Sequence, residues 1–419
     1  MRLGIWKKIF VLITFLCVLY IVVQRLLWKN DITQHQFKPI ILWWTELLPE
    51  YQREVRCGVY NCLFTVDRNY LKKETPMAIA FYASDINITD LPLPRLPNHL
   101  WALMHEESPK NVPYIQFEPV LKHFNLTATF SRYSDFPLTT QYIESIEKIT
   151  SKRFLIPVGE KTKLRKKEQL APVAFIQSIC DTMSGRDQYV RELMNYIEVD
   201  SYGGCLNNKN LPKSLSRNYL KTIDSEEFYK FLARYKFIIA YENGVCNDYI
   251  TEKFWRTIYI GSIPVYFGSP TIKDWLPNKK SAILISDFES PKALAEYLKY
   301  LDENDYEYNK YLDHKYSQIN PVSNELLKKS IIQRGFTAEN TFFEAFECFL
   351  CEKLYTDSHY VANQKHYDCE FPLRFPRMET NMKHNTWTDI VKYGRCQAEG
   401  LNHFLSMNKS FTQQEFNEF

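Results

Sequence analysis

The sequence is poor in glycine and nearly balanced in charge. It has 12 glycines among 419 residues and a formal net charge of +3. So few glycines argue against long Gly-rich linkers, and the balanced charge gives no global sign of nucleic-acid binding. The chain has no GxGxxG, P-loop, HExxH or GxSxG pattern, so the usual signatures of dinucleotide, NTP, zinc-protease and nucleophile-elbow sites are missing.

A second absence concerns metal binding. The sequence has no Asp-x-Asp motif of the kind that holds a divalent ion on a nucleotide sugar, and Glu198-Val-Asp200 is the nearest approach. We interpret that tripeptide as a solvated turn at a strand end. Cys348-x-x-Cys351 has no second close cysteine or histidine pair, so it is a weak candidate for a zinc site. We therefore predict no metal site and no cofactor.

Aromatic and apolar residues, in contrast, are plentiful. The chain is 45% hydrophobic and contains 28 tyrosines and 28 phenylalanines. This composition supports large packed cores and stacking surfaces, and the length suits two domains and a tail.

The N-terminus contains a nearly pure apolar run, Ile9–Val23, preceded by Arg2, Lys7 and Lys8. With the next apolar residues it approaches the roughly 20 residues of a spanning helix. The basic cluster favours a cytoplasmic N-terminus and a lumenal body. A cleaved signal peptide is the alternative, but bulky residues follow the run instead of a small-residue cleavage pattern. We expect residues 1–30 to be a cytoplasmic tail and a single-pass signal anchor.

Cysteines and sequons also point to an oxidising, glycosylating lumen. Cys17 of the ten cysteines lies in the apolar run, which leaves nine, so at least one thiol is free or pairs outside the chain. We expect two bridges that join a late helix to the first domain. The candidates are Cys57, Cys62, Cys348 and Cys351. The candidate glycosylation sites are Asn87, Asn125 and Asn408.

The pattern along the chain predicts two α/β domains. Apolar runs at Pro39–Leu48 and Met77–Ser84 indicate buried strands of a first domain. A charged stretch, Gly159–Pro172, indicates a linker. Strands and helices then alternate, which is typical of a parallel, doubly wound sheet. We divide the chain into a stem and N-terminal domain (31–165), a C-terminal domain (166–355) and a Cys-bearing extension (356–419).

The densest group of polar residues lies in "YENGVCNDYITEKFWR", residues 241–256. We predict a strand over 235–243 and a helix over 248–261, capped by Asn247 or Asp248. Tyr249, Glu252, Lys253 and Arg256 then share one helix face. Ligands bind at the carboxyl ends of such strands, and helix N-termini favour anions. An ordinary ion pair on a wet helix face explains the spacing equally well.

A preceding unit, "SGRDQYVRELMNYI" (184–197), indicates a second helix. Ser184 is its candidate N-cap, and Asp187 lies three residues later as in a capping box. Arg186 then lies in the opening turn, so two helix starts with cations could hold a diphosphate.

Residues 237–270, "FIIAYENGVCNDYITEKFWRTIYIGSIPVYFGSP", resemble the signature of the alpha-1,3-fucosyltransferase family. "EESP" resembles the acceptor-domain motif, "SICDTMSGRDQYVRELMNYI" the first donor-domain helix, and "FECFLC" the late cysteine motif. The similarity covers roughly residues 40–355 and is greatest to the divergent ten/eleven branch. That branch has been linked to O-fucosylation of Ser/Thr on small disulfide-rich domains, as well as to N-acetylglucosamine-type acceptors.

The resemblance implies a GT-B fold of two Rossmann-like domains facing a cleft, and an inverting transferase that uses GDP-fucose without an essential metal. It implies Glu107 as the catalytic base, since the motif places the base directly before Ser-Pro; Glu106 is the neighbouring rival. It also implies a set of donor-binding residues. They are Ser178, Arg186, Glu242, Asn243, Tyr249, Glu252 and Lys253.

The expected function is alpha-1,3-fucosyl transfer to glycans that contain N-acetylglucosamine. The first alternative is O-fucosylation of protein Ser/Thr, and the second is an inactive, membrane-tethered binder of a sugar nucleotide. The expected partners are GDP-fucose, a glycoprotein or glycan acceptor and the membrane, with no nucleic acid. The expected location is the Golgi stack, with the endoplasmic reticulum as the alternative.

Overall fold

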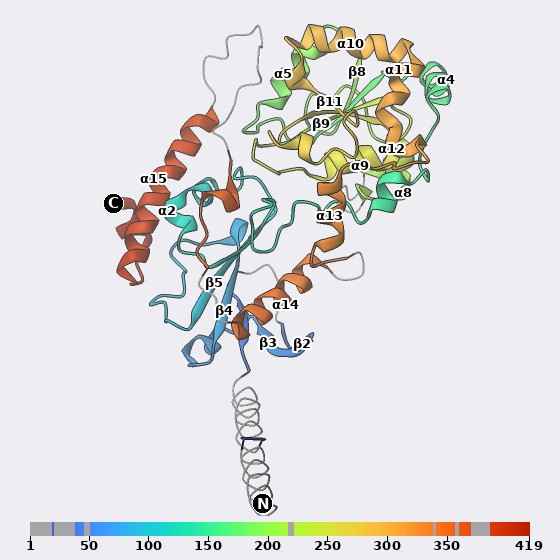
Figure 1. The fold of residues 1–419 in the computed structure, drawn as a ribbon. Helices are drawn as coiled ribbons and strands as arrows, with labels where there is room; N and C mark the ends of the chain where they lie inside the picture. The colour runs from blue at the N-terminus through green and yellow to red at the C-terminus, as the bar shows by residue number, and fades with distance from the viewer. Residues whose placement is uncertain are drawn as a thin grey trace, which may run out of the picture.

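The chain forms two α/β lobes, each built on its own sheet (Figure 1). The computed structural model describes residues 19–20, 38–45, 51–216, 222–337, 341–356, 360–369 and 386–419. Nearly all of the expected anchor, Ile9–Val23, lies outside these residues. Within them, no helix is both long and apolar enough to cross a membrane.

The first lobe contains a six-stranded sheet in the order β2-β3-β1-β4-β5-β6. Its strands pair in parallel except β2 with β3, which form an antiparallel hairpin. The strands are β1 (Ile40–Trp43), β2 (Gln52–Cys57), β3 (Tyr60–Thr65), β4 (Met77–Tyr82), β5 (His99–His105) and β6 (Leu126–Thr129). The two apolar runs predicted as strands are confirmed as β1 and β4.

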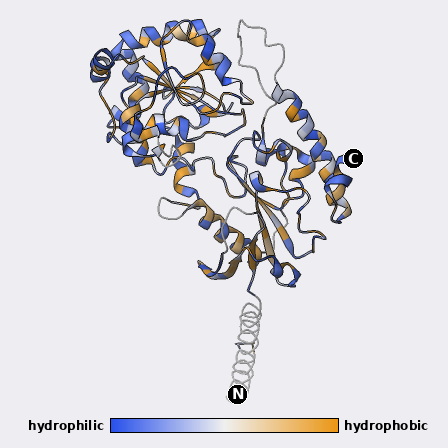
Figure 2. Cartoon of the chain, turned by 180° about the vertical axis from the view of Figure 1, so that it is seen from behind, coloured by the Kyte–Doolittle hydropathy of each residue, from blue (hydrophilic) through white to orange (hydrophobic). Residues whose placement is uncertain are grey.

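Both faces of this sheet are covered, which explains why β4 reads as continuously apolar. Ile79 and Phe81 face a core shared with α2 (Glu118–Leu121) and α15 (Thr386–Met407). The small alternate residue Ala80 faces α14. Figure 2 shows hydrophobic residues concentrated in the strands.

Helix α14 (Phe342–Tyr355) follows the second lobe in sequence but packs on the first sheet (Figure 1). The structure bridges Cys57 to Cys348 and Cys62 to Cys351, the four cysteines that the sequence marked. The predicted domain boundary at residue 355 therefore assigns α14 to the C-terminal domain, although its contacts are with the first lobe.

The second lobe contains a five-stranded, all-parallel sheet in the order β11-β10-β9-β7-β8. Helices cover both of its faces, as the strand–helix alternation predicted. The strands are β7 (Val173–Ile176), β8 (Val199–Tyr202), β9 (Phe237–Tyr241), β10 (Ile263–Phe267) and β11 (Ile283–Leu284). Its helices include α5 (Arg186–Leu193), α8 (Glu226–Leu232), α9 (Glu252–Ile260), α10 (Pro291–Glu303) and α13 (Glu325–Gln333).

Two predictions about local structure were wrong. The expected linker begins with a helix, α4 (Val158–Glu168), because Lys161 is buried and its Nζ donates to the Tyr235 and Gly261 carbonyls, each at 2.9 Å. Glu198-Val-Asp200 runs into buried strand β8 instead of forming a solvated turn.

The tail also contains α15, a helix of 22 residues for which no expectation was drawn from the sequence. The remaining helices of the described residues are short. They are α3 (Ile146–Thr150), α6 (Lys213–Ser216), α11 (Asp305–Asn309), α12 (Asp313–Tyr316) and α16 (Gln413–Glu418).

Candidate active site

The predicted site residues lie where the carboxyl ends of the strands of both sheets approach each other. Glu107 follows β5 of the first lobe, and Asn243 follows β9 of the second. Tyr249 joins them, because its hydroxyl lies 3.1 Å from Glu107 Oε2 and 3.0 Å from Asn243 Oδ1. This three-residue contact brings the candidate base and the candidate donor-binding loop together.

Glu106 and Glu107 differ in their surroundings. Glu106 Oε1 accepts a hydrogen bond from the Tyr82 hydroxyl at 2.8 Å, and burial raises the pKa of its carboxyl group. Glu107 Oε2 accepts from Tyr249, and among the described residues Oε1 has no hydrogen-bond partner. Each acid thus has one carboxylate oxygen without a hydrogen-bond partner among the described residues. Oε2 of Glu106 is buried whereas Oε1 of Glu107 is not, so Glu107 is the better placed to meet an incoming group.

The second lobe contributes a buried cluster of charge around the start of α9. Glu242 is fully buried, and its two carboxylate oxygens accept from the Thr251 backbone N–H and hydroxyl, both at 2.8 Å. Lys253 Nζ lies 3.4 Å from Glu242 Oε2 and 3.3 Å from Glu252 Oε1. A single cation is thus held between two acids at the first turn of a helix.

The pKa values in this cluster reflect the mutual proximity of its groups. Burial alone would lower the Lys253 pKa, but the charges of Glu252 and Glu242 outweigh it and raise the pKa. Burial likewise favours a raised Glu252 pKa, but Lys253 and Arg256 lower it. For Glu242 burial dominates, and its pKa is raised. Lys253 therefore stays cationic beside a carboxylate pair, which suits it to anion binding.

Arg186 is the second cation of the site and is buried at 4% exposure. Its two terminal nitrogens donate to the Tyr241 and Ile179 carbonyls, each at 3.1 Å. Among the described residues its Nε has no hydrogen-bond partner, and burial is the main cause of its lowered pKa. A buried donor without an acceptor is costly, and an anionic ligand would satisfy it.

Ser178 lies two residues after the end of β7, exposed, at the same edge of the sheet. The turn after β8 packs against its backbone: a Cβ at Gly204 would lie 2.6 Å from the Ser178 carbonyl oxygen. A Cβ at Gly203, where φ is +91°, would lie 2.3 Å from the Gln177 carbonyl oxygen. A bridge between Cys180 and Cys205, which the sequence did not identify, closes the same turn.

Two predicted helix starts were wrong. Helix α9 begins at Glu252 with Thr251 as its N-cap, so Tyr249 precedes the helix and does not share its face. Asp248 is no cap, because it binds Arg132 of the first lobe at 2.6 Å. Helix α5 begins at Arg186 after Gly185, at φ 63°, and no side chain caps it.

Ser184 instead supports the loop after β9. Its hydroxyl donates to the Glu242 carbonyl at 2.7 Å, and its N–H to the Asn243 carbonyl at 3.2 Å. These bonds hold the loop that carries three of the predicted donor-binding residues, Glu242, Asn243 and Tyr249.

Residues that the sequence analysis missed complete the site. Tyr142, in the loop before α3, lies in a carboxylate-rich environment, and burial together with these charges raises its pKa well above the ordinary value. Tyr367, from the C-terminal extension, donates to the Glu107 carbonyl at 2.6 Å. No local pattern marks either tyrosine. The acids near Tyr142 are Glu106, Glu107, Glu242 and Glu252.

The sequons differ in their surroundings. Asn87 and Asn408 are exposed, whereas Asn125 is half-buried. The Asn125 side-chain nitrogen donates to the Tyr360 carbonyl at 3.1 Å, and its oxygen accepts from the Trp101 N–H at 2.9 Å. Cys246 forms a fourth bridge to Cys369, and Cys396 is exposed and free.

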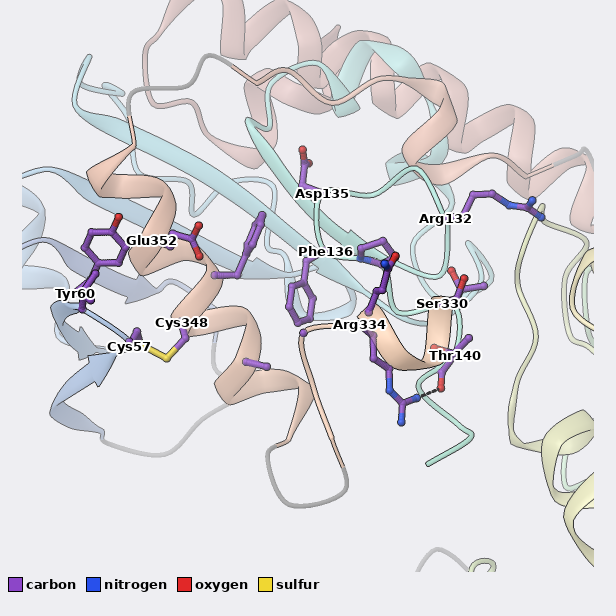
Figure 3. A pocket seen from close by; sticks show the side chains of 18 of the residues that line it. Cys57, Tyr60, Arg132, Asp135, Phe136, Thr140, Ser330, Arg334, Cys348 and Glu352 are labelled. Carbon is purple, nitrogen blue, oxygen red and sulfur yellow. Dashed lines mark hydrogen bonds between the residues drawn. A yellow bond between two sulfur atoms is a disulfide. The ribbon is translucent and has the colours of Figure 1, made fainter. Parts of the chain in front are cut away.

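A cavity of about 790 Å³ lies apart from these groups (Figure 3). It runs from the Cys57–Cys348 bridge past Phe136 to Arg334, whose guanidinium donates to the Thr140 carbonyl at 2.6 Å. None of the predicted catalytic or donor-binding residues lines it. Among the described residues no group of three or more His, Cys, Asp and Glu side chains is arranged to hold a metal ion.

The family of the chain follows from comparison with known proteins. Residues 164–368 match the model described as glycosyltransferase family 10 (fucosyltransferase) C-term, and residues 36–142 match that for the N-terminal part of fucosyltransferases. A human protein named GDP-fucose protein O-fucosyltransferase 3 is 44% identical over 399 residues, spanning 90% of this chain and 82% of its own length. The chain belongs to glycosyltransferase family 10, the fucosyltransferases.

Other similar proteins are named after a different transfer reaction. The fruit fly (Drosophila melanogaster) protein named alpha-(1,3)-fucosyltransferase B is 42% identical over 386 residues, spanning 90% of this chain and 86% of its own. A crystal structure of an alpha1,3-fucosyltransferase with GDP has a TM-score of 0.46 and 16% identity, covering 78% of this chain and 94% of that one. Relatives of this family 10 fucosyltransferase thus include proteins named protein O-fucosyltransferase and proteins named alpha-1,3-fucosyltransferase.

Proposed function

We propose that this fucosyltransferase moves L-fucose from GDP-fucose, with inversion, to a serine or threonine hydroxyl of a protein in the secretory lumen. The observation that carries the chemistry is the Glu107–Tyr249–Asn243 contact, which sets one carboxylate of the first lobe against the donor-binding loop of the second. The human relative named protein O-fucosyltransferase 3 supports the choice of a protein acceptor. We also infer a GT-B arrangement, with the acceptor on the first lobe and the donor on the second.

In this proposal Glu107 acts as the general base. The acceptor oxygen attacks the anomeric carbon as Glu107 takes its proton, and the bond from that carbon to the GDP oxygen breaks. A single carboxylate base without a second carboxylate nucleophile is the inverting design. Tyr249 donates to Oε2 and so orients the carboxylate with Oε1 toward the acceptor.

The leaving GDP gains negative charge, which two preorganised cations are placed to stabilise. Lys253 lies at the N-terminus of α9, where the helix dipole also favours anions. Arg186 supplies a buried guanidinium at the start of α5. Fixed cations in a site with little water can stabilise developing charge without a metal, so we propose that transfer needs no divalent ion. Asn243, Glu242, Glu252 and Ser178 would shape the nucleotide and fucose pocket around these cations.

A glycan acceptor is the second candidate, favoured by the relative named alpha-(1,3)-fucosyltransferase B. The two candidates share the donor chemistry and differ only in the group that meets Glu107. For location we propose a membrane-anchored lumenal enzyme of the Golgi or endoplasmic reticulum. The sequons and the four bridges of the described residues support a lumenal body.

Product analysis tests the proposal. The full chain, purified in detergent, is incubated with GDP-fucose and either a folded disulfide-rich domain or a glycopeptide bearing N-acetylglucosamine, with and without EDTA. We expect mass spectrometry to place fucose on Ser or Thr of the folded domain, with EDTA having no effect and Glu107→Gln abolishing the product. Fucose on the glycan alone would replace the protein acceptor with the second candidate. GDP binding without either product would favour an inactive binder of the sugar nucleotide.

A further inference from the structure

A segment of the C-terminal extension, residues 360–369, lies across both lobes; we term it the tail strap. On the first lobe, the Ser131 hydroxyl donates to the Lys365 carbonyl at 2.6 Å. On the second, the Asn247 N–H donates to the Asp368 carbonyl at 2.8 Å, and the Cys246 bridge to Cys369 follows directly. The strap is therefore held to both lobes, beside the loop that carries Asn243 and Tyr249.

Tyr367 is the residue of the strap that enters the site. It is fully buried, and its ring stacks on His105 with ring centroids 5.7 Å apart and an interplanar angle of 11°. Phe130 packs on it at 4.9 Å and also contacts Tyr249 at 5.1 Å. From this position the Tyr367 hydroxyl donates to the Glu107 carbonyl at 2.6 Å.

The direction of each hydrogen bond behind Tyr367 follows from the chemistry of the partners. A carbonyl only accepts, so the Tyr367 proton goes to Glu107, and the tyrosine oxygen must accept from His105 Nδ1, 2.8 Å away. Burial lowers the His105 pKa to about 3, so the ring is neutral. Its Nε2 then accepts from the Ser84 hydroxyl at 3.0 Å. A fully satisfied chain of donors therefore runs from Ser84 through His105 and Tyr367 to Glu107.

We propose that Tyr367 is a positioning residue for the catalytic base, so that the C-terminal extension completes the active site. It fixes the Glu107 backbone from the first lobe's side while Tyr249 fixes the Glu107 side chain from the second. A base held at two points keeps its free oxygen in one place, and small displacements of such groups are costly in rate. This inference rests on the proposed role of Glu107.

The test is Tyr367→Phe in the full chain, with Tyr355→Phe as the matched control. The control also loses a hydroxyl that donates to a backbone carbonyl, that of Asn61 at 2.8 Å, but it lies on α14 away from the site. Rates are measured well below the unfolding temperature and normalised to the protein that binds GDP. We expect Tyr367→Phe to lower kcat about tenfold with KM for GDP-fucose within about twofold. The control should match the unaltered chain.

Glu107→Gln, assayed alongside, separates this inference from the proposed function. An inactive Glu107→Gln with an unchanged kcat for Tyr367→Phe would overturn the positioning role and leave the base intact. An active Glu107→Gln would overturn both. If Tyr367→Phe does not fold, Ser84→Ala, which removes the far end of the chain of donors, replaces it. We expect Ser84→Ala to lower kcat about threefold at unchanged KM, and an unchanged kcat would overturn the inference.

Discussion

At the scale of single residues, the site depends on charges that set one another's protonation. Lys253 is cationic because Glu242 and Glu252 raise its pKa against the effect of burial. Its Nζ also lies 3.0 Å from the Thr251 hydroxyl. The partners of the Lys253 ammonium group are thus protein groups, and we expect a diphosphate to bind it more strongly than they do.

We predict that Lys253→Ala weakens GDP binding. A hydrogen bond to a charged group contributes about 1.5–3 kcal/mol, so the affinity should fall roughly tenfold to a hundredfold. Titration calorimetry with GDP measures it. Lys163→Ala removes an exposed lysine of α4, 75% exposed, and serves as the control. A GDP affinity of Lys253→Ala equal to that of Lys163→Ala would remove Lys253 from the donor site.

At the scale of elements, the start of α9 holds the buried charges of the candidate donor site in place. Thr251 caps the helix by accepting from the Lys253 N–H, and it also donates its hydroxyl to Glu242. The same side chain therefore ends the loop and holds the buried acid in place.

We predict that Thr251→Val lowers stability and weakens GDP-fucose binding together. Loss of an N-cap costs about 1 kcal/mol, and the freed Glu242 carboxylate would no longer be held beside Lys253. Thr341→Val in α14 removes a comparable cap, with its capping box, far from the site. Denaturant unfolding should show a loss of about 1 kcal/mol for Thr341→Val and a larger loss for Thr251→Val, which also takes a donor from the buried Glu242. KM for GDP-fucose should rise only for Thr251→Val. Equal KM values for the two would contradict the second role of Thr251.

Elements were predictable from sequence where local patterns dominate. The apolar strands β1, β4 and β9 and the helix α14 follow from their own residues. The start of α9 was not predictable, because Asp248 and Thr251 are both favourable N-cap residues. Only the ion pair of Asp248 with the distant Arg132 leaves Thr251 as the cap.

Other elements depend on contacts that no local pattern carries. Helix α4 reads as a charged linker because its buried Lys161 finds its acceptors, Tyr235 and Gly261, far along the chain. Tyr367 was missed for the same reason, since its partner Glu107 is 260 residues away. Five of the candidate donor-binding residues were recognisable because they lie close together in residues 242–253. Tyr142 and Tyr367, in contrast, come from separate segments.

At the scale of the whole molecule, a few polar contacts join the lobes. The Arg132 guanidinium lies 2.6 Å from the Asp248 carboxylate, and the side chain of Asp248 is only 1% exposed. Trp387 of α15 donates to Asp181 of the second lobe at 2.6 Å. The tail strap adds a covalent connection. The relative placement of base and donor site therefore rests on contacts that the tail helps to make.

We predict that Asp248→Asn destabilises the protein by about 3 kcal/mol at pH 7, since it leaves a partly buried arginine without its main partner. Burial would raise the Asp248 pKa, but Arg132 and the other donors outweigh it and lower the pKa. Stability from a carboxyl group with a lowered folded pKa is present above its unfolded pKa, about 3.9, and is lost as the pH falls through the folded value.

The difference in the free energy of unfolding between the unaltered protein and Asp248→Asn should therefore be constant from pH 5 to 8 and shrink below about pH 4. Unfolding in urea at several pH values measures it. Asp90→Asn, which removes an exposed partner of Arg68, should cost at most about 1 kcal/mol at any of them. A difference for Asp248→Asn that grows as the pH falls would contradict the account of this contact.

The identity of the base is the central claim, and the direct test compares kcat for Glu107→Gln and Glu106→Gln with an active acceptor. Both substitutions keep the shape of the side chain. We expect Glu107→Gln to lower kcat by about 10²–10⁴-fold, the usual contribution of a general base, with GDP affinity unchanged. Glu106→Gln should retain most of the activity, since Glu106 is bound to Tyr82. A Glu107→Gln enzyme that still turns over normally, or a greater loss in Glu106→Gln, would contradict the assignment.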